Sequence, residues 1–409
     1  MFDIKKFLED KNESEAFITG PGGSGKTEHL IGIVKELNKL KIPYQVVAFT
    51  NKAVEVIQER VPNAPSSTLH SWLKKRPGIN SEAKHLRTLI TSKQFGKPEP
   101  LRLLIVDEFS MIDESDYFSI GELIDPNMTG DILLKTLYIG DLSQLSPIKG
   151  SCPIVPQGDY WTQLTNNYRT KNQLQDTLAI LRDMINNEEF DTYLNQNNDF
   201  LRDRRIIQEY KENDSESKIL LAYTNEMVQK INKLIQGYDI PKSGDIMFNN
   251  STKEMVKLVR ELDPDEVYML HTPMKDVVLT EETKYNPLNT LKSLPYVRYY
   301  ELEDGRTIAG IFGSYENKSI RSKLGTSLTE KNKAGKNSKK EYKIFKCVND
   351  YVCVLDFGHC VTTHKTQGSE WDYVYIASKD YEKCLNRLER LKLFYVGISR
   401  ARLKCYLDN

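Results

Sequence analysis

A glycine-rich segment near the N-terminus has the composition of a phosphate-binding loop. Residues 20–27 read GPGGSGKT and match the pattern G-x4-G-K-[ST], between an expected strand and an expected helix. Glycines let backbone N–H groups approach phosphate oxygens, and the helix N-terminus adds the positive end of its dipole. A flexible glycine turn, the alternative, would not require strand, loop, Lys-Thr and helix in this order. The predicted nucleotide-binding residues are Gly20, Pro21, Gly22, Gly23, Ser24, Gly25, Lys26 and Thr27.

Side chains suited to phosphate hydrolysis accompany this loop. Lys26 is expected to bridge the β- and γ-phosphates and Thr27 to bind Mg²⁺. The apolar run LLIVDE ends in Asp107, which would hold Mg²⁺ through water, and Glu108, which would orient and deprotonate the attacking water. A positioned base typically contributes about 10²–10⁴ in rate. Carboxylates at strand ends often cap helices instead, but the loop upstream favours ATP hydrolysis.

A third polar turn follows the apolar run that ends at Ile139. The residues IGDLSQLSP place Gln144 where a neutral side chain could sense the γ-phosphate and relay its loss. Gly-Asp is also a common turn, so this assignment depends on the two sites above.

The elements that must position these groups are short strands and amphipathic helices in alternation. EAFITG, YQVVAFT, LRLLIVDE and LLKTLYIGD are continuous apolar runs, which are typical of a parallel sheet covered on both faces. The segments between them have helical spacing. This alternation predicts a doubly wound α/β domain.

A second copy of one element appears later in the chain. KILLAYTNEMVQKINKLI, residues 218–235, mirrors YQVVAFTNKAVEVIQER, residues 44–60: an apolar strand, then Ala, an aromatic residue, Thr and Asn, then an amphipathic helix. We interpret this as a trace of duplication, giving two α/β domains. Coincidence over a short stretch is the alternative.

Two stretches differ from this pattern. Residues 74–100 are basic and bounded by Pro and Gly. Residues 246–349 are rich in Tyr, Val, Ile and Thr, with a hairpin signal at Asp304-Gly305, and predict a small all-β insert. Within it, residues 331–343 form a Lys-rich loop. α/β character then returns, with strands expected over 345–357 and 372–378.

Composition excludes several classes of protein. The 57 basic and 57 acidic residues among 409 give no net charge, so nucleic-acid binding would require local placement of Lys and Arg. No apolar run approaches a membrane span, and the N-terminus lacks the features of a secretory signal, so a cytoplasmic location is expected. The six cysteines show no metal-ligand spacing and are expected to be reduced thiols.

The motifs, taken in order, resemble those of the superfamily 1B DNA helicases, in the branch of phage Dda and RecD. GPGGSGKT, AFTNKA, STLHSWL, VDEFSM, GDLSQLSPI, LTNNYRT, TTHKTQGSEWDYVYI and LFYVGISRAR are similar to motifs I, Ia, Ib, II, III, IV, V and VI. The resemblance runs from about residue 16 to the C-terminus, with its weakest parts at 74–100 and 246–349.

The resemblance implies tandem RecA-like P-loop domains that use ATP and Mg²⁺. The first would span 1–165, with 74–100 as a small insert. The second would comprise 166–245 and 350–409, with an SH3-like β insert at 246–349. It also implies that Arg169 and Arg400 stabilise charge on the transferred phosphoryl group, an effect worth about 10³–10⁵ in turnover. A surface ion pair is the alternative for each arginine.

Single-stranded DNA and its junctions with duplex are the implied partners, with a single-strand-binding protein as a further candidate and a monomer as the expected state. Phe95 is the candidate for the wedge that splits the duplex; a packed loop anchor is equally compatible. The Thr-Asn pairs could be plain helix caps. The other DNA-binding candidates are Thr50, Asn51, His70, Thr224, Asn225, Thr363, His364 and Lys365.

The expected activity is therefore ATP-dependent unwinding by a helicase that moves 5′→3′ on single-stranded DNA, with the polarity carried by resemblance alone. Two alternatives remain: a viral-type RNA helicase, and a nucleotide-gated switch that binds single strands without unwinding. Relatives carry a Gln before the P-loop that reads adenine, whereas none of the 19 residues before Gly20 is Gln. Hydrolysis of several nucleoside triphosphates is therefore expected.

Overall fold

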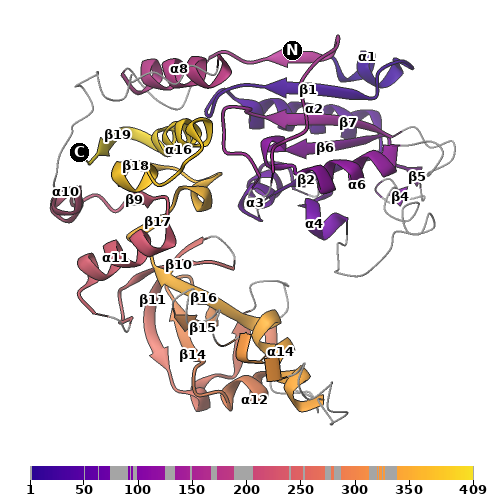
Figure 1. Ribbon diagram of the computed structural model, residues 1–409. Helices are drawn as coiled ribbons and strands as arrows, with labels where there is room; N and C mark the ends of the chain where they lie inside the picture. The colour runs from indigo at the N-terminus through magenta and orange to yellow at the C-terminus, as the bar shows by residue number, and fades with distance from the viewer. Residues whose placement is uncertain are drawn as a thin grey trace. The chain divides into compact units, whose positions relative to one another are not determined.

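The structure is a computed structural model in which the chain divides into two compact units (Figure 1). Met1–Tyr223 and Thr362–Asn409 form one unit, and Thr224–Val361 form the other. The described residues are 2–49, 51–62, 64–73, 91–92, 94, 99–124, 134–147, 150–166, 173–187, 206–238, 241–251, 254–271, 278–280, 287–312, 320, 322–324, 326–327 and 339–408.

The first unit contains a six-stranded parallel sheet with the order β3-β2-β6-β7-β1-β8. Its strands are β1 (Glu15–Thr19), β2 (Tyr44–Ala48), β3 (Ser66–Thr68), β6 (Leu103–Asp107), β7 (Lys135–Gly140) and β8 (Trp161–Gln163). Thr19 of β1 pairs with Gly140 of β7, and Asp107 of β6 pairs with Ile139. The polar segments that follow these three strands therefore leave the same edge of the sheet.

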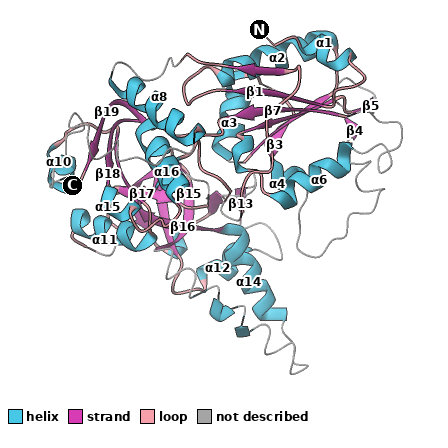
Figure 2. Cartoon of the chain, turned by 45° about the horizontal axis from the view of Figure 1, so that its top comes forward, coloured by secondary structure: helices cyan, strands magenta, loops and turns pink. Residues whose placement is uncertain are grey.

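Helices cover both faces of this sheet, as the continuous apolar runs predict (Figure 2). α1 (Ile4–Glu9), α2 (Lys26–Leu40) and α3 (Asn51–Arg60) pack on one face, in a core that includes Ile18, Val46 and Ile105. α4 (Leu69–Trp72), η1 (Phe109–Met111) and α6 (Glu114–Ile124) pack on the other, in a core with Phe17, Val47 and Val106. Adjacent strand residues point to opposite faces, so each strand contributes to both cores.

A second sheet has the order β17-β9-β18-β19, with β18 parallel to both β9 and β19. Its strands are β9 (Lys218–Ala222), β17 (Cys360–Thr362), β18 (Trp371–Ile376) and β19 (Ala401–Leu407). The helices around it are α8 (Gln173–Asn186), α10 (Ile206–Glu212), η3 (Thr363–Thr366), α15 (Ser378–Tyr381) and α16 (Arg387–Ser399). β9 followed by α11 (Asn225–Gln236) repeats the arrangement of β2 and α3, as the duplicated sequence predicts.

The second unit is built around a closed barrel of β10 (Ile246–Asn249), β11 (Glu254–Leu262), β14 (Arg298–Leu302), β15 (Thr307–Phe312) and β16 (Val352–Phe357). The predicted hairpin joins β14 to β15, with Gly305 at φ 81° in its turn. The fold-class prediction is confirmed: two parallel α/β sheets, with an all-β insert in the second. Shorter elements are β12 (Met269–His271), β13 (Val278–Thr280), η2 (Pro264–Glu266), α12 (Pro287–Lys292) and α14 (Lys339–Tyr351).

The expectation of a strand over residues 345–357 is wrong in its first half. α14 continues to Tyr351, and only then does β16 begin. Ile344, Cys347, Val348 and Tyr351 have helical spacing and pack together in the core beside the barrel. β16 pairs with β10 and β15, so it belongs to the barrel and not to the second parallel sheet.

Within residues 74–100 the structure describes one small antiparallel pair, β4 (Thr91–Ser92) with β5 (Glu99–Pro100). Among the described helices, none is both long and apolar enough to cross a membrane.

A buried lysine fastens the N-terminal segment to the sheet. The Lys135 ammonium on β7 donates to the carbonyl oxygens of Phe7 (2.5 Å), Asp10 and Glu13 (2.7 Å), and lies 4.6 Å from the centre of the Phe7 ring. Burial lowers the pKa of this ammonium, with the charge of Asp10 acting in the opposite direction. One side chain thus replaces the water that three backbone carbonyls would otherwise need.

We expect Lys135→Met to lower the free energy of unfolding by about 1–3 kcal/mol, because buried carbonyls lose their donor. Chemical denaturation measures this change. Lys39→Met, at an exposed position of α2, is the control and should change stability by less than about 0.5 kcal/mol. Equal losses of stability in the two variants would show that the hydrogen bonds from Lys135 to the three carbonyls do not stabilise the fold.

Candidate nucleotide site and nucleic-acid contacts

The glycine-rich loop joins β1 to α2 in a conformation that needs its glycines. Gly25 precedes α2 with φ 86° and ψ 16°, in the left-handed region that glycine adopts without strain. A Cβ on Gly20 would lie 2.6 Å from Ser24 Oγ and 2.8 Å from Leu164 Cβ, so no larger residue fits there. The loop is therefore shaped for close approach of its backbone to a ligand.

The Lys26 ammonium closes over this loop. It donates to the carbonyl oxygens of Gly20 at 2.7 Å and Pro21 at 2.8 Å. Ser24 is buried, and its Oγ has no hydrogen-bond partner among the residues that the structure describes. A cationic amine and an unsatisfied hydroxyl on a loop at a helix N-terminus form a cradle suited to phosphate oxygens.

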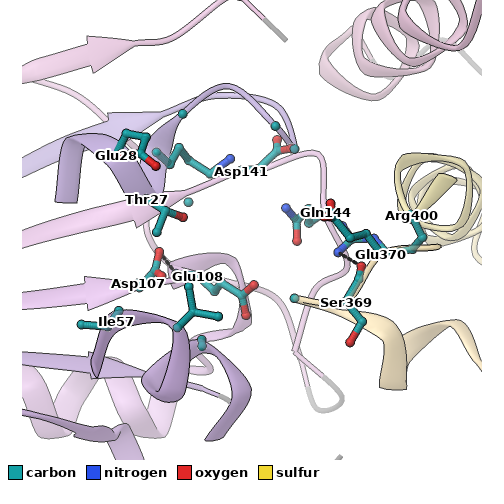
Figure 3. A pocket seen from close by; sticks show the side chains of 18 of the residues that line it. Thr27, Glu28, Ile57, Asp107, Glu108, Asp141, Gln144, Ser369, Glu370 and Arg400 are labelled. Carbon is teal, nitrogen blue, oxygen red and sulfur yellow. Dashed lines mark hydrogen bonds between the residues drawn. The ribbon is translucent and has the colours of Figure 1, made fainter. Parts of the chain in front are cut away.

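The residues that could hold Mg²⁺ lie beside this loop. Thr27 is the second residue of α2, Asp107 ends β6, and both line the same cavity (Figure 3). Burial raises the pKa of the Asp107 carboxyl, while the charge of Lys26 and the N–H of Glu108 lower it. A half-buried carboxylate beside a hydroxyl is a hard-oxygen donor set, so the residues present fit a magnesium ion.

Glu108 has an unusual backbone. With φ 57° and ψ 44° it lies in the left-handed region, and Lys41 is the other described non-glycine residue at positive φ. Such a conformation costs of the order of 1–3 kcal/mol and is concentrated at functional sites. It places the Glu108 carboxylate in the cavity beside Asp107 (Figure 3).

The segment after β7 is fixed by Asp141. One carboxylate oxygen accepts from Ser143 N at 3.0 Å, and the Asp141 carbonyl accepts from Gln144 N at 3.1 Å. The second carboxylate oxygen accepts from the hydroxyl of Tyr395 on α16, at 2.7 Å. Asp141 and Tyr395 are each only 1% exposed, so this bond is shielded from water. Burial, and then the negative charge of Asp141, raise the pKa of Tyr395 far above its usual range, which keeps the phenol protonated.

A second contact between the same segment and α16 reinforces the first. Ser146 Oγ donates to Glu389 at 2.6 Å, and Lys392 Nζ donates to Ser146 Oγ at 2.8 Å. Tyr395, Glu389 and Lys392 are all on α16, the helix that ends at Arg400. The Gln144 segment and the Arg400 helix are therefore linked by two sets of hydrogen bonds.

Arg400 follows α16 directly and is buried, with 2% exposure. Its guanidinium donates to the carbonyl oxygens of Val396 at 3.2 Å, Ser369 at 3.4 Å and Thr366 at 3.5 Å. The last two distances are at the long end of hydrogen bonding. The guanidinium also donates to Ser399 Oγ, from Nη2 at 3.0 Å and from Nε at 3.2 Å. The two long bonds to the Ser369 and Thr366 carbonyls are the ones that a stronger acceptor could replace.

These groups line one cavity of about 810 Å³ within the first unit. In Figure 3, Gln144 lies between a side that carries Thr27, Asp107 and Glu108 and a side that carries Ser369 and Arg400. A Cβ built on Gly368 would come within 4.0 Å of a Glu108 carboxylate oxygen. Six of the expected catalytic and metal-binding residues therefore line one cavity: Lys26, Thr27, Asp107, Glu108, Gln144 and Arg400.

One candidate nucleic-acid contact lies beyond β3. His70 is on α4, with its Nε2 3.4 Å from the buried carboxylate of Asp116. Its ring packs edge-on against Phe49, with the two centres 5.8 Å apart and an interplanar angle of 88°. The His70 side chain remains 55% exposed, so it is accessible to a ligand.

The candidates after β17 divide into interior and accessible groups. Thr363 is fully buried; its hydroxyl donates to Ala222 O at 3.3 Å and hydrogen-bonds to Tyr381. The Thr363 hydroxyl is thus used within the protein, and a contact between Thr363 and DNA stays a prediction. His364 and Lys365 are partly exposed in η3, and burial lowers the pKa of His364.

The other expected residues are placed as follows. Thr224 caps α11 by accepting from Met227 N at 3.2 Å, and Asn225 is exposed at the first position of that helix. Asn51 begins α3. Three expected residues, Thr50, Phe95 and Arg169, lie outside the described part of the chain, as does most of the Lys-rich loop.

Asp141 and Tyr395 were not among the expected site residues, although both lie inside the quoted motifs. The sequence could have drawn attention to Asp141 as a charged residue that directly follows a buried strand. Nothing in the pattern around Tyr395 distinguishes it from the core residues of α16, since Phe394 and Val396 are buried too.

Comparison with known families agrees with the two parallel sheets. Residues 6–149 match the model of an AAA domain, and residues 357–407 match the model of a UvrD-like helicase C-terminal domain. The first match contains the P-loop and the strand-end carboxylates. The second contains η3, α16 and Arg400.

Two relatives align with nearly the whole chain. An uncharacterized protein of Acanthamoeba polyphaga mimivirus is 23% identical over 97% of this chain and 96% of its own length. The ATP-dependent RecD2 DNA helicase of Deinococcus radiodurans is 23% identical over 94% of this chain, which spans 45% of that relative.

Solved structures share the fold. The Pif1 helicase of Candida albicans has a TM-score of 0.54 and 16% identity, covering 97% of this chain and 90% of that one. A Bacteroides Pif1 bound to single-stranded DNA has a TM-score of 0.51 and 17% identity, covering 99% and 91%. The motifs and the two family matches support a superfamily 1B helicase of the RecD and Pif1 type, and the solved structures share the fold.

Proposed function

We propose that this chain is an ATP-driven DNA helicase that moves along single-stranded DNA. The observation that carries the proposal is the single cavity where the P-loop, the strand-end carboxylates, Gln144 and Arg400 meet. Such a site binds a nucleoside triphosphate and supplies a base, a sensor and a cation for the transferred phosphoryl group. The unwinding activity is inferred from similarity to the RecD2 helicase and the Pif1 helicase.

The residues of the chain would divide the chemistry as follows. Lys26 leaves the carbonyls of its own loop and binds the β- and γ-phosphate oxygens. Thr27 and Asp107 hold Mg²⁺, which neutralises phosphate charge when bound. Glu108 accepts a proton from the attacking water. Arg400 exchanges its long bonds to the Thr366 and Ser369 carbonyls for a phosphate oxygen.

The Asp141–Tyr395 bond would couple nucleotide state to movement. Loss of the γ-phosphate changes what Gln144 contacts, and Gln144 is on the segment that Asp141 organises. Because Asp141 also bonds to α16, a shift of that segment moves the helix that ends at Arg400. Gln144 and Arg400 would then both respond to the loss of the γ-phosphate.

Several finer features belong to the same proposal. The Bacteroides structure bound to single-stranded DNA supports a single strand as the partner. Movement 5′→3′, a monomer, a role for a single-strand-binding protein, a cytoplasmic location, and contacts from Thr50, Asn51, His70, Thr224, Asn225, His364 and Lys365 follow from the resemblance. The expected division was 1–165, 166–245 with 350–409, and an insert at 246–349. The pairing of β16 with β10 and β15 supports an insert that ends at Phe357, with the second domain resuming at residue 358.

We expect Glu108→Gln to bind ATP with little change in Kd but to lower kcat by about 10²–10⁴, because the amide cannot accept the proton of the attacking water. Steady-state ATP hydrolysis with a titration of a fluorescent ATP analogue checks both values. Glu114→Gln, at an exposed position of α6, is the matched control. A kcat equal to that of the unmodified protein would assign the base elsewhere.

We expect Tyr395→Phe to lower kcat about tenfold or more while KM for ATP changes less than about twofold, because the lost bond misplaces Gln144 and Arg400 without touching the P-loop. It should also cost about 1.5–3 kcal/mol of stability, since the acceptor is charged. Tyr138→Phe is the control, a buried tyrosine whose hydroxyl lies 3.4 Å from Glu15. If Tyr395→Phe loses only stability and keeps kcat, the bond is structural.

The experiment that tests the function is unwinding of duplexes with a 5′ or a 3′ single-stranded tail, with ATP and Mg²⁺. We expect separation of the 5′-tailed duplex alone, and of neither duplex by Lys26→Ala, which loses the phosphate-binding ammonium. Separation of the 3′-tailed duplex alone would show that the helicase moves 3′→5′. Turnover stimulated by RNA and not by DNA would indicate an RNA helicase, and ATP-dependent binding without separation would indicate a switch.

A further inference from the structure

Helix α8 carries an arginine on the face that it turns towards the interior. α8 packs beside α16 within the first unit (Figure 2). Leu178, Leu181 and Ile185 of α8 are buried. Arg182 is four residues after Leu178 and follows Leu181 directly, so it lies on the same side of the helix as these apolar residues.

The charge of Arg182 acts on the hydroxyl of Tyr395. Burial, and then the negative charge of Asp141, raise the pKa of Tyr395, whereas the positive charge of Arg182 and the N–H of Gly22 act in the opposite direction. Such effects weaken with distance, so Arg182 and Gly22 both lie near the phenol. Four parts of the chain therefore meet at this hydroxyl: the P-loop, the segment after β7, α8 and α16.

The fold holds the Arg182 guanidinium in place without satisfying all of it. Its Nε is shielded from water and has no hydrogen-bond partner among the residues that the structure describes. A buried N–H that makes no bond costs free energy, so this group does not repay its burial through that atom. An unsatisfied buried donor of this kind calls for a role other than stability.

The buried carboxylate of Asp141 gives the charge of Arg182 such a role. Asp141 is 1% exposed, and its two oxygens accept from the Ser143 N–H and the Tyr395 hydroxyl, which are both neutral donors. A buried carboxylate is costly unless a positive charge lies near it. Arg182 supplies a positive charge beside the Asp141–Tyr395 bond.

We infer that Arg182 is a positioning residue of the nucleotide site, whose charge stabilises the bond between Asp141 and Tyr395. Through that bond it keeps the segment with Gln144 and the helix that ends at Arg400 in place. This rests on the proposed function and deepens it. Arg182 lies outside the eight motifs of the sequence, so no pattern there marks it.

The test is ATP hydrolysis stimulated by an oligothymidylate, with kcat and KM measured separately. We expect Arg182→Gln, which removes the charge, to lower kcat about two- to thirtyfold while KM for ATP changes less than about twofold. Arg182→Lys keeps the charge and should keep kcat within about twofold, because the effect does not need the planar fork of the guanidinium. Arg387→Gln makes the same substitution at an exposed position of α16 and is the matched control, with kcat unchanged.

A double variant separates action through the bond from direct contact with the nucleotide. If Arg182 acts through the phenol, Arg182→Gln with Tyr395→Phe should hydrolyse ATP no more slowly than Tyr395→Phe alone. A guanidinium that binds a phosphate oxygen would instead multiply the two effects. Should Arg182→Gln fail to fold, Arg182→Met, which leaves no polar group to bury, carries the same comparisons.

Three results would overturn the inference: an unchanged kcat in Arg182→Gln and Arg182→Met, effects that multiply in the double variant, or a loss in Arg182→Lys equal to that in Arg182→Gln. Failure of the proposed function has a different signature, since the unmodified protein would then hydrolyse no ATP in response to a single strand, and the inference would fall with it. Full hydrolysis by Arg182→Gln beside an active unmodified protein would remove the inference alone.

Discussion

The position of β7 between β1 and β6 is the constraint on which the site depends. Parallel strands deliver their carboxyl ends to one edge, and this order places the segment with Asp141 and Gln144 between the P-loop and the Asp107–Glu108 pair. Each strand is buried on both faces, so a shift in register would disrupt two cores at once. The arrangement of the catalytic groups is thus fixed by the packing of the sheet.

Buried polar bonds extend this order to α16. One carboxylate oxygen of Asp141 accepts from the Ser143 N–H in the turn after β7, and the other accepts from the Tyr395 hydroxyl. A buried carboxylate that loses a hydrogen-bond donor costs free energy, because no water replaces the donor. This cost favours movement of the segment after β7 together with α16. Arg400 is bound to Val396 and Ser399 of its own helix, and it makes two longer bonds to the carbonyls of Thr366 and Ser369. The site therefore combines a buried link at the proposed sensor segment with a guanidinium whose two longest bonds, to Thr366 and Ser369, are the ones that a phosphate oxygen could replace.

The sequence predicted the parts of this account that depend on local patterns. The apolar runs predicted the parallel strands, GPGGSGKT predicted the loop, and Asp304-Gly305 predicted a hairpin of the barrel. It did not predict the helix ending at Tyr351, because its apolar residues were read as a strand continuing into β16. Nor did it predict the Asp141–Tyr395 bond or the contact between the Phe49 and His70 rings. These join residues far apart in the chain, and periodicity carries no information on such contacts.

The central claim is that one ATP site is shared between the P-loop half and the half that carries Arg400. Single-turnover ATP hydrolysis in Arg400→Ala, with and without single-stranded DNA, tests it most directly. The account predicts that ATP affinity changes little while the rate falls by about 10³ or more, and that DNA no longer accelerates it. A rate close to that of the unmodified protein, still accelerated by DNA, would contradict the shared site.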